Sequence, residues 1–113
     1  MALKRMILEI GMGNDLHGGD YTKAAVRAVQ DAVHHSSLSM IRSLGIDWKE
    51  VRITITIGVQ NPDTIDADAV KATLPGGQIT VHSVQGGLDI PDPGADDLAV
   101  IATAAVEVFV DLP

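Results

Sequence analysis

The sequence predicts an α+β fold of the order βαβαββ, in which a single mixed sheet carries its helices on one face. Apolar residues recur at three- and four-residue spacing over residues 22–44, as in a helix, whereas apolar and polar residues alternate over 51–59 and 98–112, as in strands. The aromatic residues are one Trp, one Tyr and one Phe, so the core must consist of Val, Ile, Leu and Ala. Such a core is shallow, which suits one sheet packed against one helical layer.

Length, charge and cysteine content narrow the class of protein. The 113 residues are expected to form one domain, 1–113. The net charge of −7 and the scattered cations argue against a nucleic-acid partner, because phosphates are bound by clustered Lys and Arg. The absence of cysteine excludes disulfides, thiolate catalysis and zinc–thiolate sites. No apolar run reaches the ~18 residues of a membrane helix, so we expect a cytoplasmic protein without a membrane partner.

The first half of the chain is predicted as a strand, a glycine-rich turn and a long helix. The strand covers residues 6–10, and the helix runs from Thr22 to about Leu44, where Gly45 ends it. A kink or break is expected at residues 34–39, because His and Ser weaken helix propensity there. One flank of the helix is made of small residues that would let another backbone approach closely: Ala24, Ala25, Ala28 and Ala32.

The second half is predicted as a turn at 47–50, a strand at 51–59, a short helix at 65–72, a strand at 78–85, a loop at 88–97 and a last strand from Ala105, with a helical or extended lead-in from Leu98. Five residues are expected on the sheet face opposite the helices: Glu9, Thr54, Thr56, His82 and Glu107. That face would be partly polar, in a chain whose hydrophobic core is small. Oligomerisation around a symmetry axis is the simplest way to use it.

The glycine-rich stretch from Gly11 to Ala24 is the candidate functional site. Asp20 or Thr22 is expected to cap the helix, whose free amides and positive dipole end would face the turn beside Lys23 and Arg27. This geometry suits an anion. The candidate catalytic residues are His17, Asp20, Lys23 and Ser83, and the candidate ligand-binding residues are Gly13, Asp15, Gly18, Gly19, Arg27, Gly86 and Gly87. A purely structural turn remains the alternative, and the glycine spacing matches neither a dinucleotide nor a phosphate-loop motif.

No cofactor and no metal are expected. Two adjacent histidines on a helix, His34 and His35, point about 100° apart and cannot both bind one metal with the usual i, i+4 spacing. A divalent-metal alternative would use Asp15, His17 and Asp20 together with a loop acid such as Asp92.

The run GMGNDLHGGDYTKAAVRA, residues 11–28, closely resembles the hallmark of a family of short, uncharacterised conserved proteins. Segments 74–77, 85–88 and 104–108 resemble the same family, so the match covers nearly the whole chain. At a coarser level, the element order and the Asp-rich loop before a long last strand look like the trimeric bacterial chorismate mutase and the YjgF-type proteins. That resemblance implies a pseudo-barrel homotrimer that binds small anions between subunits. Mutase activity is not expected, because no arginine follows Gly87.

A third resemblance concerns ring-opening cyclic amide hydrolases, which are similar to three concatenated units of about this size, each with a lysine and a serine. It implies Lys23 as base and Ser83 as nucleophile, although Met12 stands where those enzymes carry their lysine. Three functions therefore stay open. The chain is a homotrimer that binds a small anionic or cyclic-imide ligand at a subunit junction, a hydrolase of this kind, or a structural or regulatory trimer held by ion pairs of Asp20, Lys23 and Arg27.

Overall fold

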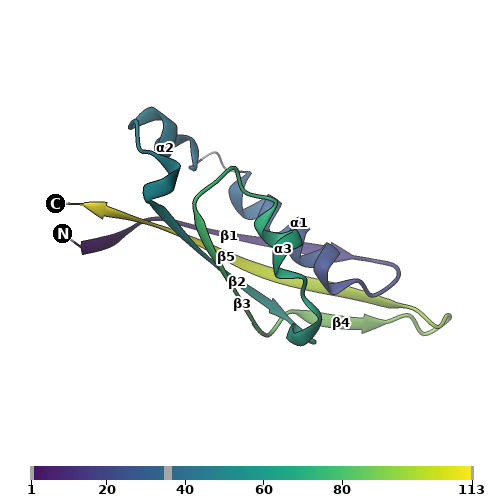
Figure 1. The fold of residues 1–113 in the computed structure, drawn as a ribbon. Helices are drawn as coiled ribbons and strands as arrows, with labels where there is room; N and C mark the ends of the chain where they lie inside the picture. The colour runs from purple at the N-terminus through teal and green to yellow at the C-terminus, as the bar shows by residue number, and fades with distance from the viewer. Residues whose placement is uncertain (1, 35–36, 113) are drawn as a thin grey trace.

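The computed structural model describes residues 2–34 and 37–112, and there it confirms an α+β fold with a five-stranded mixed sheet and three α-helices (Figure 1). The strands are β1 (Ala2–Asp15), β2 (Val51–Val59), β3 (Gln78–Gln85), β4 (Leu88–Pro91) and β5 (Leu98–Leu112). The helices are α1 (Tyr21–Val33), α2 (Ser39–Ser43) and α3 (Ala67–Lys71), with short 3₁₀ turns η1 (Trp48–Glu50) and η2 (Pro62–Thr64). His35, one of the two adjacent histidines for which no metal role is expected, lies outside the described residues.

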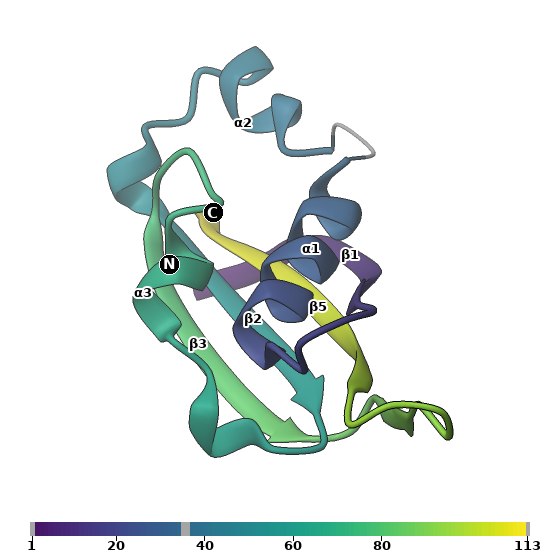
Figure 2. The ribbon, with the colours of Figure 1, turned by 90° about the vertical axis from the view of Figure 1, so that its right-hand side faces the viewer.

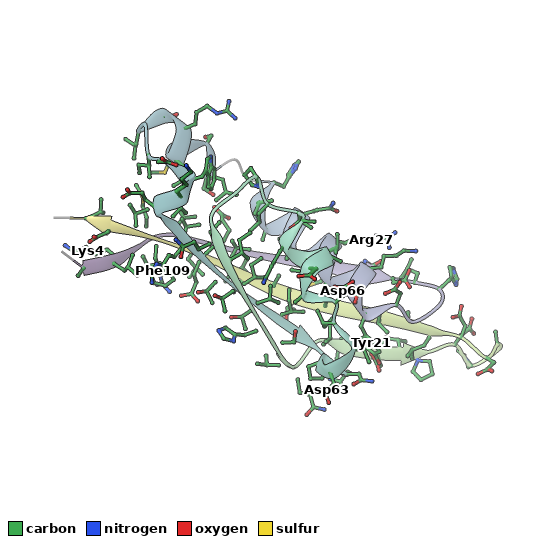
Figure 3. All side chains as sticks on the ribbon, in the orientation of Figure 1. Lys4, Tyr21, Arg27, Asp63, Asp66 and Phe109 are labelled. Carbon is green, nitrogen blue, oxygen red and sulfur yellow. The ribbon has the colours of Figure 1, made fainter. Side chains whose placement is uncertain are left out.

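The long strands β1 and β5 set the shape of the molecule. The strand order is β1-β5-β2-β3, with β5 antiparallel to both of its neighbours and β2 parallel to β3. Strand β4 pairs with the first residues of β5, beyond the point where β2 ends. Both termini lie at one end of the sheet, near Lys4 and Phe109, whereas Tyr21 lies toward the other end (Figure 3).

The core lies between one face of this sheet and the helices. Helices α1 and α3 cover the same face, α1 over β1 and β5 and α3 beside β3 (Figure 2). The predicted alternation in β2 and β5 is confirmed, because the side chains that are buried against the helices are every second residue. They are Val51, Ile53, Ile55, Ile57 and Val59 in β2, and Val100, Ala102, Ala104, Val106, Val108 and Val110 in β5. None of the helices in the described residues covers the other face, and we call it the open face.

Helix α1 lies unusually close to β1. A Cβ on Gly11 would overlap the backbone of Ala28 and Ala32, and a Cβ on Gly13 would overlap the backbone of Ala24 and Ala28. The predicted close approach of another backbone to the alanine flank is therefore confirmed. Gly11 and Gly13 belong to β1 and not to a turn, which corrects the predicted end of the first strand at residue 10.

Other predicted boundaries also need correction. The predicted helix 22–44 is two helices, α1 and α2, and the break falls where His and Ser residues were expected to weaken it. The predicted loop 88–97 begins with β4, because residues 88–91 pair with the part of β5 that β2 does not reach. The last strand is extended from Leu98 onward, without a helical lead-in.

The predicted open face is confirmed for Thr54, Thr56, His82 and Glu107 and is wrong for Glu9. Gly11 and Gly13 lie against the backbone of α1, so the odd-numbered residues of β1 from Ile7 onward point to the helical side of the sheet. Glu9 is one of these residues. Its carboxylate accepts a hydrogen bond from the Ser37 hydroxyl. In the described ranges, no helix has the length and apolar character needed to cross a bilayer.

Candidate functional site

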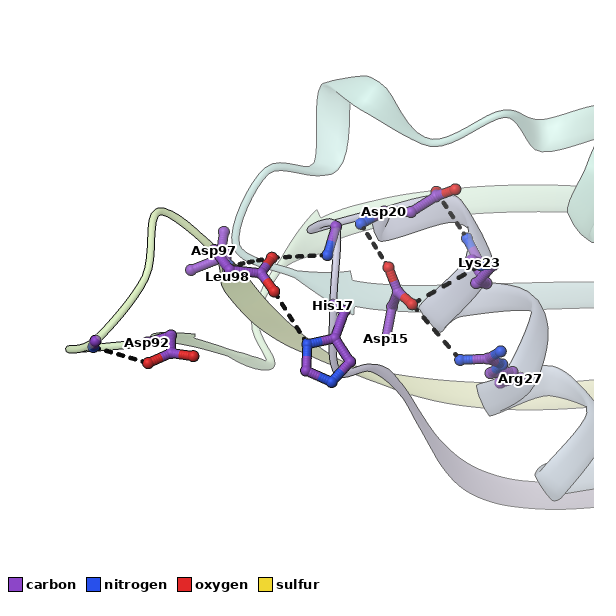
Figure 4. A network of polar contacts seen from close by, with 10 residues as sticks. Asp15, His17, Asp20, Lys23, Arg27, Asp92, Asp97 and Leu98 are labelled. Atoms are coloured by element: carbon purple, nitrogen blue, oxygen red, sulfur yellow. Dashed lines mark hydrogen bonds and ion pairs between the residues drawn. The ribbon is translucent and has the colours of Figure 1, made fainter.

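The glycine-rich loop follows β1 and leads into α1 (Figure 4). Gly18 and Gly19 take φ values of 97° and 63°, a region closed to most other residues, so they allow the chain to turn sharply. Asp20 is the N-cap: its Oδ1 accepts a hydrogen bond from the Lys23 amide at 3.0 Å. Asp15 is buried behind it, and its Oδ2 accepts from the Asp20 amide at 3.0 Å. The first turn of α1 is therefore capped by the chain's own carboxylates.

Lys23 and Arg27 converge on the same buried carboxylate. The Asp15 Oδ1 lies 3.9 Å from Lys23 Nζ and 3.7 Å from Arg27 Nη1. Arg27 Nη1 also donates to the Asn14 carbonyl at 2.7 Å. Both cations are therefore turned back toward the end of β1, and the negative charge of Asp15 offsets part of the field that an external anion would feel.

His17 and Asp97 form a second polar pair, which joins the loop to the start of β5. The Asp97 carboxylate lies 3.0 Å from His17 Nδ1 and accepts hydrogen bonds from the amides of Gly18 and Leu98, each at 2.8 Å. The Gly18 amide, the His17 side chain and the Leu98 amide lower the pKa of Asp97 to about 2. The His17 side chain is 84% exposed, so its ring can present Nε2 to a ligand while Asp97 holds Nδ1.

A shallow hollow of about 500 Å³ adjoins this pair. It is lined by Gly18, Gly19, Pro91, Asp96, Asp97 and Leu98. Its ionisable lining residues are both acidic, so the hollow favours a hydrogen-bond donor over an anion. The residues of the metal alternative do not assemble: within the described part of the chain, no three His, Asp or Glu side chains are grouped to hold a metal ion. The Asp92 carboxylate instead accepts from the Gly94 amide at 2.8 Å.

The remaining predicted site residues lie apart from this loop network. Gly13 packs under α1, and Gly86 and Gly87 form the connection from β3 to β4, where the side-chain amide of Gln60 donates to both carbonyls at 3.1 and 3.2 Å. Ser83 is partly buried on β3. It is paired with Ile57 and so lies on the face of the sheet that the helices cover. Within residues 2–34 and 37–112, no hydrogen bond or ion pair joins Ser83 to Lys23.

Several polar residues of this region were not predicted. Asp31 of α1 accepts a hydrogen bond from the Met12 amide at 2.9 Å and so covers part of the edge of β1. The Tyr21 hydroxyl donates to Asp89 at 2.5 Å, a bond that raises the pKa of Tyr21 above its ordinary value. The other Asp89 oxygen is buried without a described partner. Asp89 and Asp97 belong to an Asp-rich segment. The pairing of β1 with β5 brings Asp97 to the loop, and the pairing of β4 with β5 brings Asp89 there.

The fold and the loop network define a small α+β protein with one helical layer over a mixed sheet. Residues 5–108 match the family model described as "Conserved hypothetical protein (Lin0512_fam)", and the chain belongs to this family. The predicted resemblance to short, uncharacterised conserved proteins is thereby confirmed. The crystal structure of an FtsZ-like protein of unknown function from Nostoc punctiforme PCC 73102 is similar, with 35% identity, 99% of each chain covered and a TM-score of 0.83. No protein of curated function matches the sequence.

Proposed function

We propose that this protein is a homotrimer that binds a small ligand where the glycine-rich loop of one copy meets the sheet of its neighbour. The observation that carries the proposal is an apolar patch on the open face, at the end of the sheet that bears the loop. The patch consists of Ile10, Met12, Val84, Leu88 and Ile90, of which Ile10 is 66% and Met12 61% exposed. Contiguous exposed apolar surface of this kind commonly marks an interface.

Strand register places the patch residues on one face of the sheet. Met12, Thr103, Gly58 and Val84 form one row across four strands, because each is paired with the next. On β5, Leu88 pairs with Ile101, which lies two residues before Thr103. Ile90 pairs with Ala99, which lies two residues before Ile101. Paired residues share a face of the sheet, so the patch residues all lie on the open face at one end of the sheet, with Thr103 and Gly58 between Met12 and Val84.

The dimensions of the chain support association through this face. The radius of gyration is 15.3 Å, against about 13 Å for a compact domain of this length. The chain measures 57 × 23 × 18 Å, so its broad side is large enough for a stable interface, which covers about 800 Å² on each partner. The resemblance to trimeric pseudo-barrel proteins supplies the number of copies.

The polar network supports a cyclic imide over an anion as the ligand. An imide offers an N–H donor between two carbonyl acceptors, and the exposed His17 ring beside Asp97 can accept that proton. Lys23 and Arg27 are instead directed at Asp15. The hydrolase alternative requires Ser83 to approach Lys23 from another copy. The structural alternative, a trimer held by ion pairs of Asp20, Lys23 and Arg27 between copies, requires both cations to exchange their partner Asp15 for an acid of another copy.

The assembly is tested by sedimentation equilibrium of Met12→Asp, with Met40→Asp as the matched control. Met40 is also exposed, at 43%, but lies on α2, away from the open face. We expect Met12→Asp to dissociate the trimer and Met40→Asp to leave it intact. A trimer that survives Met12→Asp, or a monomeric parent protein, would refute the assembly.

The ligand is tested by thermal shift with succinimide and with succinate, since a compound that binds only the folded state raises the melting temperature. We expect stabilisation by succinimide, lost in His17→Ala and kept in Lys23→Ala. Stabilisation by succinate that Lys23→Ala abolishes would show that the ligand is an anion. A response to neither compound in an intact trimer would favour the structural role.

A further inference from the structure

A second hollow lies on the open face, at the end of the sheet that carries the termini. Its volume is about 450 Å³, within the range of about 300–1,000 Å³ that is usual for small-molecule sites. Five of its lining side chains carry the argument: Arg52, Thr54, Gln78, Thr80 and Phe109. None of them belongs to the glycine-rich loop.

Strand register explains why these side chains lie together. Phe109, Arg52 and Gln78 form one row across β5, β2 and β3, and Thr54 and Thr80 are paired in the row two residues further along. Residues that are paired across neighbouring strands have Cβ atoms about 5 Å apart. A guanidinium, a phenyl ring, an amide and two hydroxyls therefore border one hollow.

Three of the polar side chains of this hollow are available for a ligand, whereas the Gln78 side-chain amide donates to the Lys49 carbonyl at 3.2 Å. In residues 2–34 and 37–112, the side chains of Arg52, Thr54 and Thr80 make no hydrogen bond or ion pair, in contrast to Lys23 and Arg27. The nearest acid in the Thr54 row is Glu107. It is engaged by Arg5, whose Nη1 lies 3.2 Å from Glu107 Oε2.

An adjoining hollow of about 290 Å³ shares Arg52 and Gln78 and adds Lys49, Glu50 and Asp111. The two acids there balance Lys49 and the Arg52 charge, so the region has no strong net field. Recognition must therefore come from directed hydrogen bonds and from contact with the ring of Phe109, and not from charge alone.

We propose that the Arg52 hollow binds a small carboxylate with a flat apolar body. The planar guanidinium of Arg52 can donate two parallel hydrogen bonds to a carboxylate, and the hydroxyls of Thr54 and Thr80 can donate to the same oxygens. Phe109 and the exposed side chain of Leu3 supply the apolar surface. The site is complete in one chain, so it does not depend on the trimer or on the glycine-rich loop.

The experiment is a titration with benzoate, followed by backbone amide chemical shifts, with benzamide and inorganic phosphate as comparison probes. Benzamide keeps the ring without the charge, and phosphate keeps the charge without the ring. We expect benzoate to shift the amides of Arg52, Thr54 and Thr80 and to bind more tightly than either comparison probe.

Arg52→Gln should weaken benzoate binding about tenfold or more, since a hydrogen-bonded charge pair is lost. Arg42→Gln is the matched control, because Arg42 is an exposed arginine on α2, and it should bind as the parent protein does. Melting curves establish that both variants are folded. Equal loss in both variants, equal binding of phosphate, or shifts confined to Lys23 and Arg27 would overturn the proposal.

Met12→Asp separates this inference from the proposed function. It disrupts the apolar patch at the other end of the open face and should leave benzoate binding unchanged. If Met12→Asp abolishes benzoate binding, the carboxylate site requires the assembly. That result would also overturn the proposal that the site is complete in one chain.

Discussion

Asp97 holds the glycine-rich loop against the start of β5 through two contacts of its carboxylate, with the His17 ring and the Gly18 amide, and it also accepts a hydrogen bond from the neighbouring Leu98 amide. Its pKa in the folded protein is about 2, below the ordinary value of 3.8. A carboxylate whose pKa is lowered by folding stabilises the native state above its unfolded pKa, and this contribution is lost as the pH falls through the folded value. The contribution of Asp97 is therefore complete above about pH 4 and disappears toward pH 2.

Asp97→Asn should melt at a lower temperature than the parent protein at pH 7. Its melting temperature should then fall less steeply between about pH 4 and pH 2, because the variant no longer has this group to protonate. Melting curves across that range make the comparison. Asp63→Asn, which alters an exposed acid without a described bond, serves as control and should follow the parent. Parallel curves for Asp97→Asn and the parent would contradict the role of Asp97.

The residues of the loop network could be predicted only in part. The Asp20 cap follows from a short acid placed just before a periodic helix, and the four-residue spacing of Lys23 and Arg27 places both on one helix face. The burial of Asp15 and the contact of His17 with Asp97 could not be predicted in this way. Both depend on how β1 and β5 pair, over a separation of some eighty residues.

At the scale of elements, the approach of α1 to β1 explains two of the glycines. Local propensity places Gly11 and Gly13 in a turn, because glycine readily leaves extended structure. In the fold they remain extended, since only a residue without a Cβ fits beneath the helix backbone. The signal that could have identified them is the match between their two-residue spacing and the four-residue spacing of Ala24, Ala28 and Ala32.

Gly13→Ala should destabilise the protein by about 3 kcal/mol, the upper end of the usual cost of overpacking. The added methyl would overlap backbone atoms of Ala24 and Ala28, which cannot move aside as a flexible side chain can. Urea denaturation measures the change in the free energy of unfolding. Gly94→Ala is the matched control, because a Cβ there would meet the Asp92 side chain at an ordinary 3.6 Å. A similar small effect of both substitutions would show that α1 can shift away from β1.

Strand prediction succeeded where alternation was long and failed where it was short. The alternation of β2 and β5 continues over enough residues to identify the buried face. Strand β4 has four residues and ends in a proline, so its sequence has the features of a loop. It becomes a strand because β5 extends beyond β2 and offers free backbone groups to a partner.

At the scale of the whole molecule, charge and apolar surface oppose each other. In the proposed trimer each copy has a net charge of −7, so the copies repel one another, and the apolar patch of the open face must outweigh that repulsion. Charges also occur on the open face, but Arg5 and Glu107 form a pair there. The acids of the loop network and of the Asp-rich segment lie at the same end of the sheet as the patch, and the repulsion between exposed acids of different copies depends on ionic strength.

Association should therefore become tighter when salt is raised from about 0.01 M to about 0.15 M, because the screening length falls from about 30 to about 8 Å while apolar contacts are retained. Sedimentation equilibrium at the two concentrations measures the change. Ion pairs of Asp20, Lys23 and Arg27 between copies would give the opposite result, since salt weakens attraction between exposed charges. The sign of the salt dependence thus distinguishes an assembly built on the apolar patch from one built on the charged loop.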